Sequence, residues 1–433
     1  MKIEPFEDAS ERYLNWLGTK LTLVPTEVEK RRTRLAASTP FEFLRATFYR
    51  WAQVWPEVCP ELNRDKVPLV LGVGDLHAEN FGTWRDGEGR LVWGVNDFDE
   101  CGYLPYTNDL VRLAASVRFG IEDQAIAALK KVRKLPGQKR RAEVLRQIKE
   151  LRERKEVRKQ VKAIFPAACR AILGGYCDGL NLKFKADKES MEQTGKGREP
   201  IILAERHDWL REIVLNKLRG KTTAGNDANA PSKANDFAEF FAEMNALPPI
   251  NAVVPRSAWD AINQTMPEPD LKFRLCKREA GLGSLGRQRF TAVVEQWCGG
   301  ILVREAKSLA PSAWLWWDEK RRDAAEILYA EALRQAVRAR DPWLRVYLGA
   351  PRDNWVVRRL GPDSGKVKLR DLPQGDGLEY KLWRAMGREI ANVHLPMGDV
   401  MAHLATLNKD SDWLCKAAEA MAETVVADWK TAC

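Results

Sequence analysis

The chain lacks several features that define common classes of protein. It contains no CxxC pair and only four histidines, so its eight scattered cysteines do not resemble the ligands of a structural zinc site. It contains no run of about eighteen apolar residues, and no basic-then-apolar stretch at its start. We therefore expect a cytoplasmic protein with free thiols and no membrane span.

The composition is that of a folded protein of more than one part. Apolar residues make up 45% of the chain and charged residues 30%, which excludes intrinsic disorder. The chain has 433 residues, which is more than the usual length of a domain with a single hydrophobic core. The stretch 220–236, GKTTAGNDANAPSKAND, has no periodicity and is rich in small and polar residues. We interpret it as a linker between two lobes.

The positive charge of the chain is concentrated in one segment. Residues 130–162 contain 15 Lys and Arg against 4 Asp and Glu, a local +11, whereas the whole chain carries +10. Apolar residues recur there at near-helical spacing, which predicts an amphipathic helix with a basic outer face. That face is either simply solvated or binds an acidic partner, RNA or an anionic surface. No aromatic residue interleaves the charges, which weakens a base-stacking model for single strands.

Two acidic loops follow predicted strands in the first third of the chain. In the first acidic loop, Gly74–Gly82, Asp75 precedes Asn80 by five positions. This pairing suits phosphoryl transfer, in which the aspartate orients or deprotonates the acceptor hydroxyl and the asparagine amide oxygen holds Mg²⁺. In the second acidic loop, Asn96–Glu100, Asp97 and Asp99 can reach one cation from a strand end. Each motif alone is compatible with an ordinary acidic turn, but their succession favours a site.

A glycine loop occurs much later in the chain. Its sequence, Gly281-Leu282-Gly283-Ser284-Leu285-Gly286, matches GxGxxG, but β-type runs follow it where a dinucleotide-binding fold would have a helix. A glycine loop that joins two strands covers nucleotide phosphates in kinases, where a lysine on the next strand pairs with the phosphates. Lys307 occupies that place. We expect a carboxylate from the next helix to pair with it, either Glu326 or Glu331, and spacing slightly favours Glu326.

Six segments together resemble the bacterial family known as domain of unknown function 2252. They are STPFEFLRATFYR (38–50), GDLHAENFG (74–82), VNDFDE (95–100), PYTNDLVRLAAS (105–116), GLGSLGRQRF (281–290) and VREAKS (303–308). The acidic loops are also similar to those of aminoglycoside phosphotransferases and choline kinases.

This resemblance implies a role for each acidic residue. Asp75 would be the catalytic base, Asn80 a Mg²⁺ ligand, Asp97 the principal metal ligand and Asp99 an auxiliary one. Asp109 would brace the catalytic loop by hydrogen bonding to its backbone. The histidine that usually stands two positions before the catalytic aspartate is replaced by Val73, so whatever it orients must be held otherwise.

The order of the motifs is inverted relative to ordinary kinases, because the acidic loops precede the glycine loop and Lys307. A circular permutation preserves the geometry of such a site. The fold class implied is α+β, a circularly permuted, two-lobed, protein kinase-like fold. Its parts would be a larger helical lobe (1–219), the linker (220–236), a β-rich nucleotide lobe (237–360) and C-terminal helices that return to the helical lobe (361–433). Within the last part, the helix 382–394 would pack beneath the catalytic loop.

The leading hypothesis is a phosphotransferase that moves the γ-phosphate of ATP, with Mg²⁺, to a hydroxyl acceptor of unknown identity. Gly281, Gly283, Ser284, Gly286 and Lys307 would hold the phosphates. The alternatives are a nucleotide-binding pseudokinase or regulatory scaffold, an enzyme that transfers AMP, and a basic nucleic-acid-binding protein.

Overall fold

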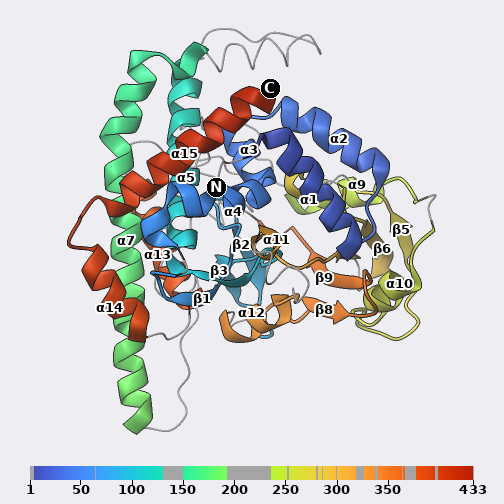
Figure 1. Cartoon of the computed structure of the whole chain (residues 1–433). Helices are drawn as coiled ribbons and strands as arrows, with labels where there is room; N and C mark the ends of the chain where they lie inside the picture. Colours follow the sequence, from blue (N-terminus) through green and yellow to red (C-terminus); the bar gives the residue numbers. More distant parts are fainter. Residues whose placement is uncertain are drawn as a thin grey trace, which may run out of the picture.

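The structure is a computed structural model, and it has a mixed α+β fold (Figure 1). It describes residues 4–63, 65–129, 150–192, 236–250, 253–278, 281–284, 286–298, 300–317, 326–336, 340–362, 364–365, 377–394 and 398–432. The predicted linker 220–236 lies outside these ranges except for its last residue. In the part of the chain that the structure describes, no helix is both long and apolar enough to cross a membrane.

Helices from both ends of the chain build one part of the molecule (Figure 1). They are α1 (Phe6–Lys20), α2 (Pro25–Ala36), α3 (Pro40–Ala46), α4 (Phe48–Val58), η1 (Pro60–Leu62), α5 (Tyr106–Leu129), α7 (Lys155–Glu192), α13 (Leu378–Val393), α14 (Gly398–Leu407) and α15 (Trp413–Ala432). Their apolar faces share one large core, which includes Trp51, Trp55 and Trp429. The late helices therefore pack against the early ones.

The helix α13 packs closely along α7, and glycines permit the approach. A Cβ atom at Gly175 would lie 1.9 Å from the Arg384 carbonyl oxygen, and one at Gly387 would lie 1.9 Å from the Ile172 carbonyl oxygen. Two helix backbones can lie this near only where side chains are missing. The contact directs the end of α13, at His394, toward the start of α5.

Two short antiparallel strand pairs lie within the helical part. The strand β1 (Leu69–Gly72) pairs with β4 (Gly102–Pro105), and β2 (Phe81–Arg85) pairs with β3 (Leu91–Val95). All five residues of β3 are buried. The predicted strands before both acidic loops are confirmed, since β1 ends just before the first acidic loop and β3 ends just before the second.

The late part of the chain forms a five-stranded antiparallel sheet. The strands β5 (Arg274–Cys276), β6 (Arg289–Trp297), β7 (Gly300–Ser308), β8 (Arg345–Leu348) and β9 (Asn354–Leu360) lie in the order β5-β6-β7-β9-β8. The helices α9 (Asp236–Asn245) and α10 (Arg256–Asn263) contact this sheet. A second core forms between α10 and the sheet around Phe290 and Trp355. The strand β7, which carries Lys307, is the central strand.

Of two helical predictions, one differs from the structure and the other is confirmed in its described part. The pattern from Ala313 to Arg340 predicts one helix, but the described residues form two short ones, α11 (Ala313–Trp317) and α12 (Tyr329–Ala336). Of the predicted basic helix, residues 130–149 lie outside the described ranges, and α7 begins at Lys155. Val157 and Val161 on α7 are buried while Arg158 is exposed, so the amphipathic pattern is confirmed there.

Candidate active site

The turn after β1 is built by a glycine and a carboxylate. Gly74 has a φ of +79°, and a Cβ atom there would lie 2.1 Å from the Glu100 carbonyl oxygen. Only glycine fits this position without strain. Asp109 accepts hydrogen bonds from the Val73 and Gly74 backbone N–H groups at 2.7 and 2.9 Å. The expected brace on the first acidic loop is thus confirmed.

A histidine from the other end of the chain completes this brace. His394, directly after α13, lies with its Nε2 atom 3.0 Å from an Asp109 carboxylate oxygen, and Tyr176 lies 3.0 Å from its Nδ1 atom. All three side chains are fully buried. His394 and Asp109, which are 285 residues apart in the sequence, therefore contact each other directly beneath the first acidic loop.

Asp75 is partly buried and contacts a fully buried arginine. Arg112 on α5 donates to the Asp75 carboxylate from Nε at 2.8 Å and from Nη2 at 2.5 Å. Its guanidinium lies 4.9 and 4.8 Å from the ring centroids of Phe48 and Trp51. Burial raises the pKa of Asp75, and Arg112 opposes that rise. Sequence analysis did not single out Arg112, although a cation on the apolar helix α5, three residues after Asp109, was a usable signal.

Asn80 is held so that its amide oxygen remains available. Its Nδ2 atom donates to the Asp75 and Asp97 carbonyl oxygens at 3.3 and 3.0 Å. Its Oδ1 atom is buried and has no hydrogen-bond partner among the described residues. A buried acceptor without a partner is costly unless a ligand satisfies it. This is the oxygen that the sequence prediction assigns to Mg²⁺.

Lys307 reaches the second acidic loop from the central strand of the sheet. Its Nζ atom lies 3.7 Å from an Asp97 carboxylate oxygen and forms a closer ion pair with Asp99. Burial lowers the pKa of Lys307, while Asp97 acts in the opposite direction. The second acidic loop and the late sheet therefore meet at Lys307.

The expected partner of Lys307 is not the one that the structure shows. Glu326 is exposed and lies before α12, and no described contact joins it to Lys307. Glu331 on α12 instead pairs with Arg334 and accepts a hydrogen bond from Gln335. The carboxylates beside Lys307 come from the second acidic loop because β7 faces that loop directly. The prediction that Glu326 is the partner of Lys307 is therefore wrong, because Asp97 and Asp99 occupy that position.

The glycine loop lies against the helices that flank the first acidic loop. Its described residues form a short 3-10 turn, η2 (Leu282–Ser284), between β5 and β6, as predicted. A Cβ atom at Gly283 would lie 2.9 Å from the Arg45 carbonyl oxygen on α3. Arg45 in turn pairs with Glu79 of the first acidic loop at 2.6 Å. One arginine thus connects the two loops.

Arg287, directly after the glycine loop, is a second connection that sequence analysis missed. Its guanidinium lies 3.0 Å from Glu100 and 3.5 Å from Asp99. Glu100 also accepts a hydrogen bond from the Ala313 backbone N–H group at 2.6 Å. These buried contacts fix the sheet against the second acidic loop. An arginine after a glycine loop carries no distinctive pattern, so the sequence offered no signal for it.

The residues present fit a magnesium ion that also binds phosphate. Within the described ranges, no group of three or more His, Cys, Asp or Glu gathers closely enough to hold a metal by itself. Mg²⁺ is usually held by one or two carboxylates together with substrate phosphates, rather than by a cage of protein ligands. Asn80 supplies an unpartnered buried oxygen, as does Asp99, and Asp97 supplies a partly exposed carboxylate. Such a set suits an ion that arrives with its phosphate ligand.

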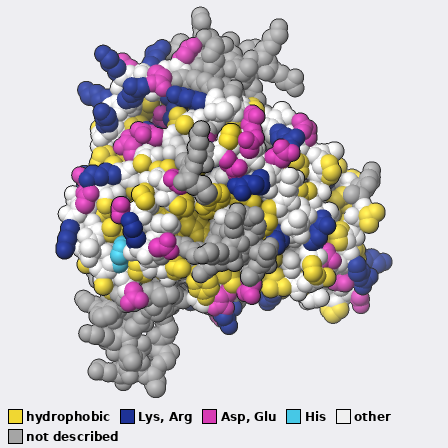
Figure 2. All heavy atoms as spheres, viewed as in Figure 1, with side chains coloured by type: hydrophobic (Ala, Val, Ile, Leu, Met, Phe, Trp, Pro, Cys, Tyr) yellow, Lys and Arg dark blue, Asp and Glu magenta, His cyan; other side chains and the backbone are white. Residues whose placement is uncertain are grey.

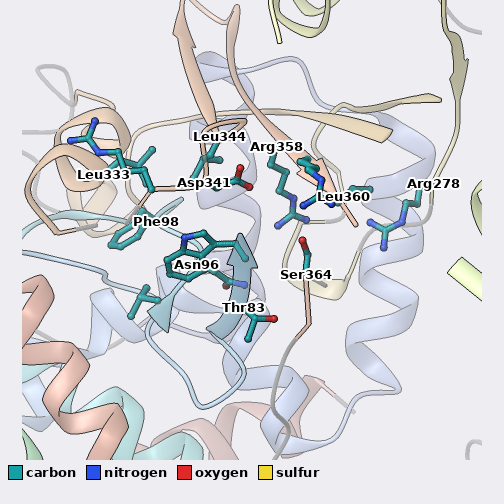
Figure 3. A pocket seen from close by; sticks show the side chains of 14 residues that line it. Thr83, Asn96, Phe98, Arg278, Leu333, Asp341, Leu344, Arg358, Leu360 and Ser364 are labelled. Atoms are coloured by element: carbon teal, nitrogen blue, oxygen red, sulfur yellow. The ribbon is translucent and has the colours of Figure 1, made fainter. Parts of the chain in front are cut away.

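A pocket adjoins this group of residues (Figure 3). It is lined by Thr83, Trp84, Val95, Asn96, Phe98, Arg278, Leu333, Arg340, Asp341, Leu344, Arg358, Arg359, Leu360 and Ser364. Figure 3 shows Phe98, Leu333 and Leu344 at one end and Arg358, Arg278 and Ser364 at the other. We call it the arginine pocket, because four of its lining residues are arginines and one is an acid. Its residues come from both β2–β3 and the large sheet.

Among the comparisons with known proteins, one protein-family model matches, and the match covers part of the chain. The family model described as "Uncharacterized protein conserved in bacteria (DUF2252)" matches residues 23–167. The match covers a third of the chain, from α2 through the start of α7, and includes both acidic loops. The glycine loop and Lys307 lie outside it. No curated protein matches the chain, and no solved structure matches it either.

Proposed function

We propose that this protein is a kinase-like phosphotransferase that uses ATP and Mg²⁺ to phosphorylate a hydroxyl acceptor. The single observation that carries the proposal is the approach of Lys307 to Asp97 at 3.7 Å. In kinases, the lysine that pairs with the nucleotide phosphates and the aspartate that holds the metal must both be in place around one triphosphate. Lys307 and Asp97 are about 200 residues apart in this sequence, and their contact supports the same two roles here.

The large sheet supports the same proposal. A glycine loop joins its first two strands, β5 and β6, and Lys307 stands on its third, β7. This is the order of parts that covers and pairs the phosphates in protein kinases. The acidic loops lie in the helical part, so the two parts correspond to a nucleotide lobe and a catalytic lobe in permuted order. Arg45 on α3 lies beside Gly283 of the glycine loop through its backbone carbonyl, and its side chain pairs with Glu79 of the first acidic loop.

In the proposed reaction, the acceptor hydroxyl oxygen bonds to the γ-phosphorus while the bond from that phosphorus to the β–γ bridging oxygen breaks. ADP leaves with the electron pair, and the proton of the hydroxyl passes to Asp75. Lys307 would neutralise phosphate oxygens, and Asn80 and Asp97 would hold the metal. Mg²⁺ would supply further neutralisation of the charge that develops on the phosphates. Arg112 holds the Asp75 carboxylate in a fixed position.

The test is the fate of label from ATP labelled in either the α- or the γ-phosphate, incubated with Mg²⁺ and a panel of hydroxyl acceptors or with the protein alone. Transfer of γ label supports the proposal. Transfer of α label would indicate an AMP transferase, and binding of ATP without transfer of either label would indicate a pseudokinase. The control is the variant Asp75→Asn. This variant should still bind ATP, but its turnover should be roughly 10²- to 10⁴-fold lower than that of the wild type, which is the usual contribution of a positioned base.

A further inference from the structure

Three arginines surround one buried glutamate at the arginine pocket. Glu305 lies on β7, two residues before Lys307, and is completely buried. It accepts hydrogen bonds from Arg278 at 3.0 Å and from Arg358 at 2.8 and 3.1 Å, and it pairs with Arg289 at 2.5 Å. Three positive charges thus face one negative charge. Glu305 alone therefore does not balance the three arginines that it contacts.

The unmatched charge faces the pocket. Arg278 and Arg358 line it, with side chains 32% and 36% exposed, whereas Arg289 is 9% exposed. Glu305 receives one hydrogen bond from Arg278 and two from Arg358. A guanidinium has five N–H donors, so donors of both arginines remain for a ligand. Figure 3 shows the two guanidinium groups at the same end of the pocket, near Ser364.

The electrostatics of this cluster agree with its geometry. Burial alone would raise the pKa of Glu305, but the three arginines outweigh it and hold that pKa well below its usual range. Burial likewise opposes the charge on Arg358, but Glu305 and Asp97 raise its pKa. Glu305 and Arg358 are therefore both held in their charged forms.

A purine base is a poor match for this end of the pocket. Bases bind best between apolar surfaces with a few directed hydrogen bonds, whereas here Arg278 and Arg358 present fixed forks of donors. Such forks match phosphate oxygens in geometry and charge. The hydroxyl of Ser364 lies at the same end. Glu305 orders the arginines before any ligand arrives, which lowers the entropic cost of binding.

We propose that Arg278 and Arg358 bind phosphate groups of the nucleotide, so that its polyphosphate extends from Lys307 and Asp97 into the arginine pocket and the base lies away from these arginines. This inference rests on the proposed function for the identity of the ligand as a nucleotide. It assigns the arginine pocket to the polyphosphate and not to the base.

The experiment is displacement of fluorescent ATP from the full-length protein, in Mg²⁺, by inorganic triphosphate and by adenosine. Triphosphate should displace the probe and adenosine should not, because the recognised group is the phosphate chain. Arg278→Ala should weaken triphosphate and ATP together, on the order of 10-fold or more, the value of one charge-assisted hydrogen bond. Arg278→Lys should recover part of the affinity, because it keeps the charge without the fork.

Arg345→Ala is the matched control, since Arg345 is an exposed arginine on β8 of the same sheet and does not line the pocket. It should leave both affinities unchanged. Arg278 is the preferred site because its removal leaves Glu305 with two other arginines, and thermal unfolding of each variant checks that the sheet is intact.

Displacement by adenosine but not by triphosphate, or an unchanged triphosphate affinity in Arg278→Ala, would overturn the phosphate assignment and leave ATP-dependent transfer standing. Triphosphate binding that requires Arg278, in a protein that transfers no label from ATP, would support the assignment and overturn the proposed function alone. A protein that binds neither ATP nor triphosphate would contradict both.

Discussion

The two aspartates proposed for chemistry lie in different surroundings, although each follows a short strand. Asp75 is bound by Arg112, which is itself enclosed by aromatic rings. Asp97 faces Lys307 and is more exposed, at 33% against 24% for Asp75. A carboxylate fixed by one arginine is suited to accept a proton at a defined point, whereas an accessible carboxylate beside a cation is suited to share a metal and phosphate.

The pH dependence of turnover should report on Asp75. A base acts when ionised, and burial raises the pKa of this carboxyl despite Arg112. As pH falls, kcat/KM should therefore decline with a midpoint above about 4, the value of an unperturbed aspartate. Arg112→Gln should move that midpoint to still higher pH, because it removes the cation that favours ionised Asp75. The measurement is the pH profile of kcat/KM for both proteins, with circular dichroism to check folding.

A midpoint at or below about 4 in the wild type, or one that Arg112→Gln does not move, would contradict the assignment of Asp75 as the base.

Removal of the Asp97 carboxylate should uncouple nucleotide binding from the metal. In the wild type, Mg²⁺ should strengthen ATP binding, because the ion joins protein oxygens to phosphate oxygens. Asp97→Ala should bind ATP with the same affinity in Mg²⁺ and in EDTA, as measured by calorimetry. Asp99→Ala, the matched variant in the same loop, should keep part of the metal dependence. Full metal dependence in Asp97→Ala would exclude Asp97 as the principal ligand.

At the scale of elements, the first acidic loop is positioned by a turn that admits no side chain. The strand β1 ends, Gly74 turns the chain with positive φ, and Asp109 at the start of α5 accepts both neighbouring N–H groups. His394 at the end of α13 holds Asp109 in turn. Three elements from distant parts of the sequence thus set the direction in which Asp75 points.

Gly74→Ala should damage both stability and turnover. The left-handed φ alone costs an alanine about 1 kcal/mol, and the contact of its Cβ with the Glu100 carbonyl at 2.1 Å adds to this. Gly89→Ala is a close control, because Gly89 has a φ of +74° but no atom within 4 Å of the added Cβ. Urea unfolding should show a destabilisation of about 1 kcal/mol for Gly89→Ala and a clearly larger one for Gly74→Ala. Equal destabilisation would refute the close approach.

At the scale of the whole molecule, charge is distributed unevenly over the surface. Lys and Arg side chains gather at the upper left of Figure 2, at the end of the molecule where α7 begins in Figure 1. The exposed basic residues of that part of α7 are Lys155, Arg158, Lys159 and Lys162. None of them lines the arginine pocket. The basic face and the proposed active site are therefore separate features of the protein.

Replacement of these four residues by glutamine should leave ATP affinity within about twofold of the wild type, since none of them lines the arginine pocket and salt screens exposed charges over a Debye length of about 8 Å. Any binding to single-stranded RNA should weaken and depend less on salt, because the logarithmic slope falls by about 0.7 for each phosphate that the protein no longer neutralises. The affinities for fluorescent ATP and for fluorescent single-stranded RNA are measured by fluorescence anisotropy at several salt concentrations. A large decrease in ATP affinity would show that the basic face takes part in nucleotide binding.

Local patterns in the sequence were sufficient to predict the strands and the helix that position the candidate site. The apolar runs before each acidic loop predicted β1 and β3, and the β-type runs around the glycine loop predicted β6 and β7. The helix proposed for residues 382–394 corresponds to α13. These predictions succeeded because alternation and helical spacing depend on which face of an element is buried, and that information is written in neighbouring residues.

What the sequence by itself determined is the set of candidate site residues, Asp75, Asn80, Asp97 and Lys307, and the strands next to them. Only the tertiary structure decided which groups meet. It paired Lys307 with Asp97 and Asp99 in place of Glu326, brought Arg112 to Asp75, and assembled three arginines around Glu305. The physical reason is that one carboxylate offers a lysine the same charge as another, so the choice depends on the distances that long-range packing sets.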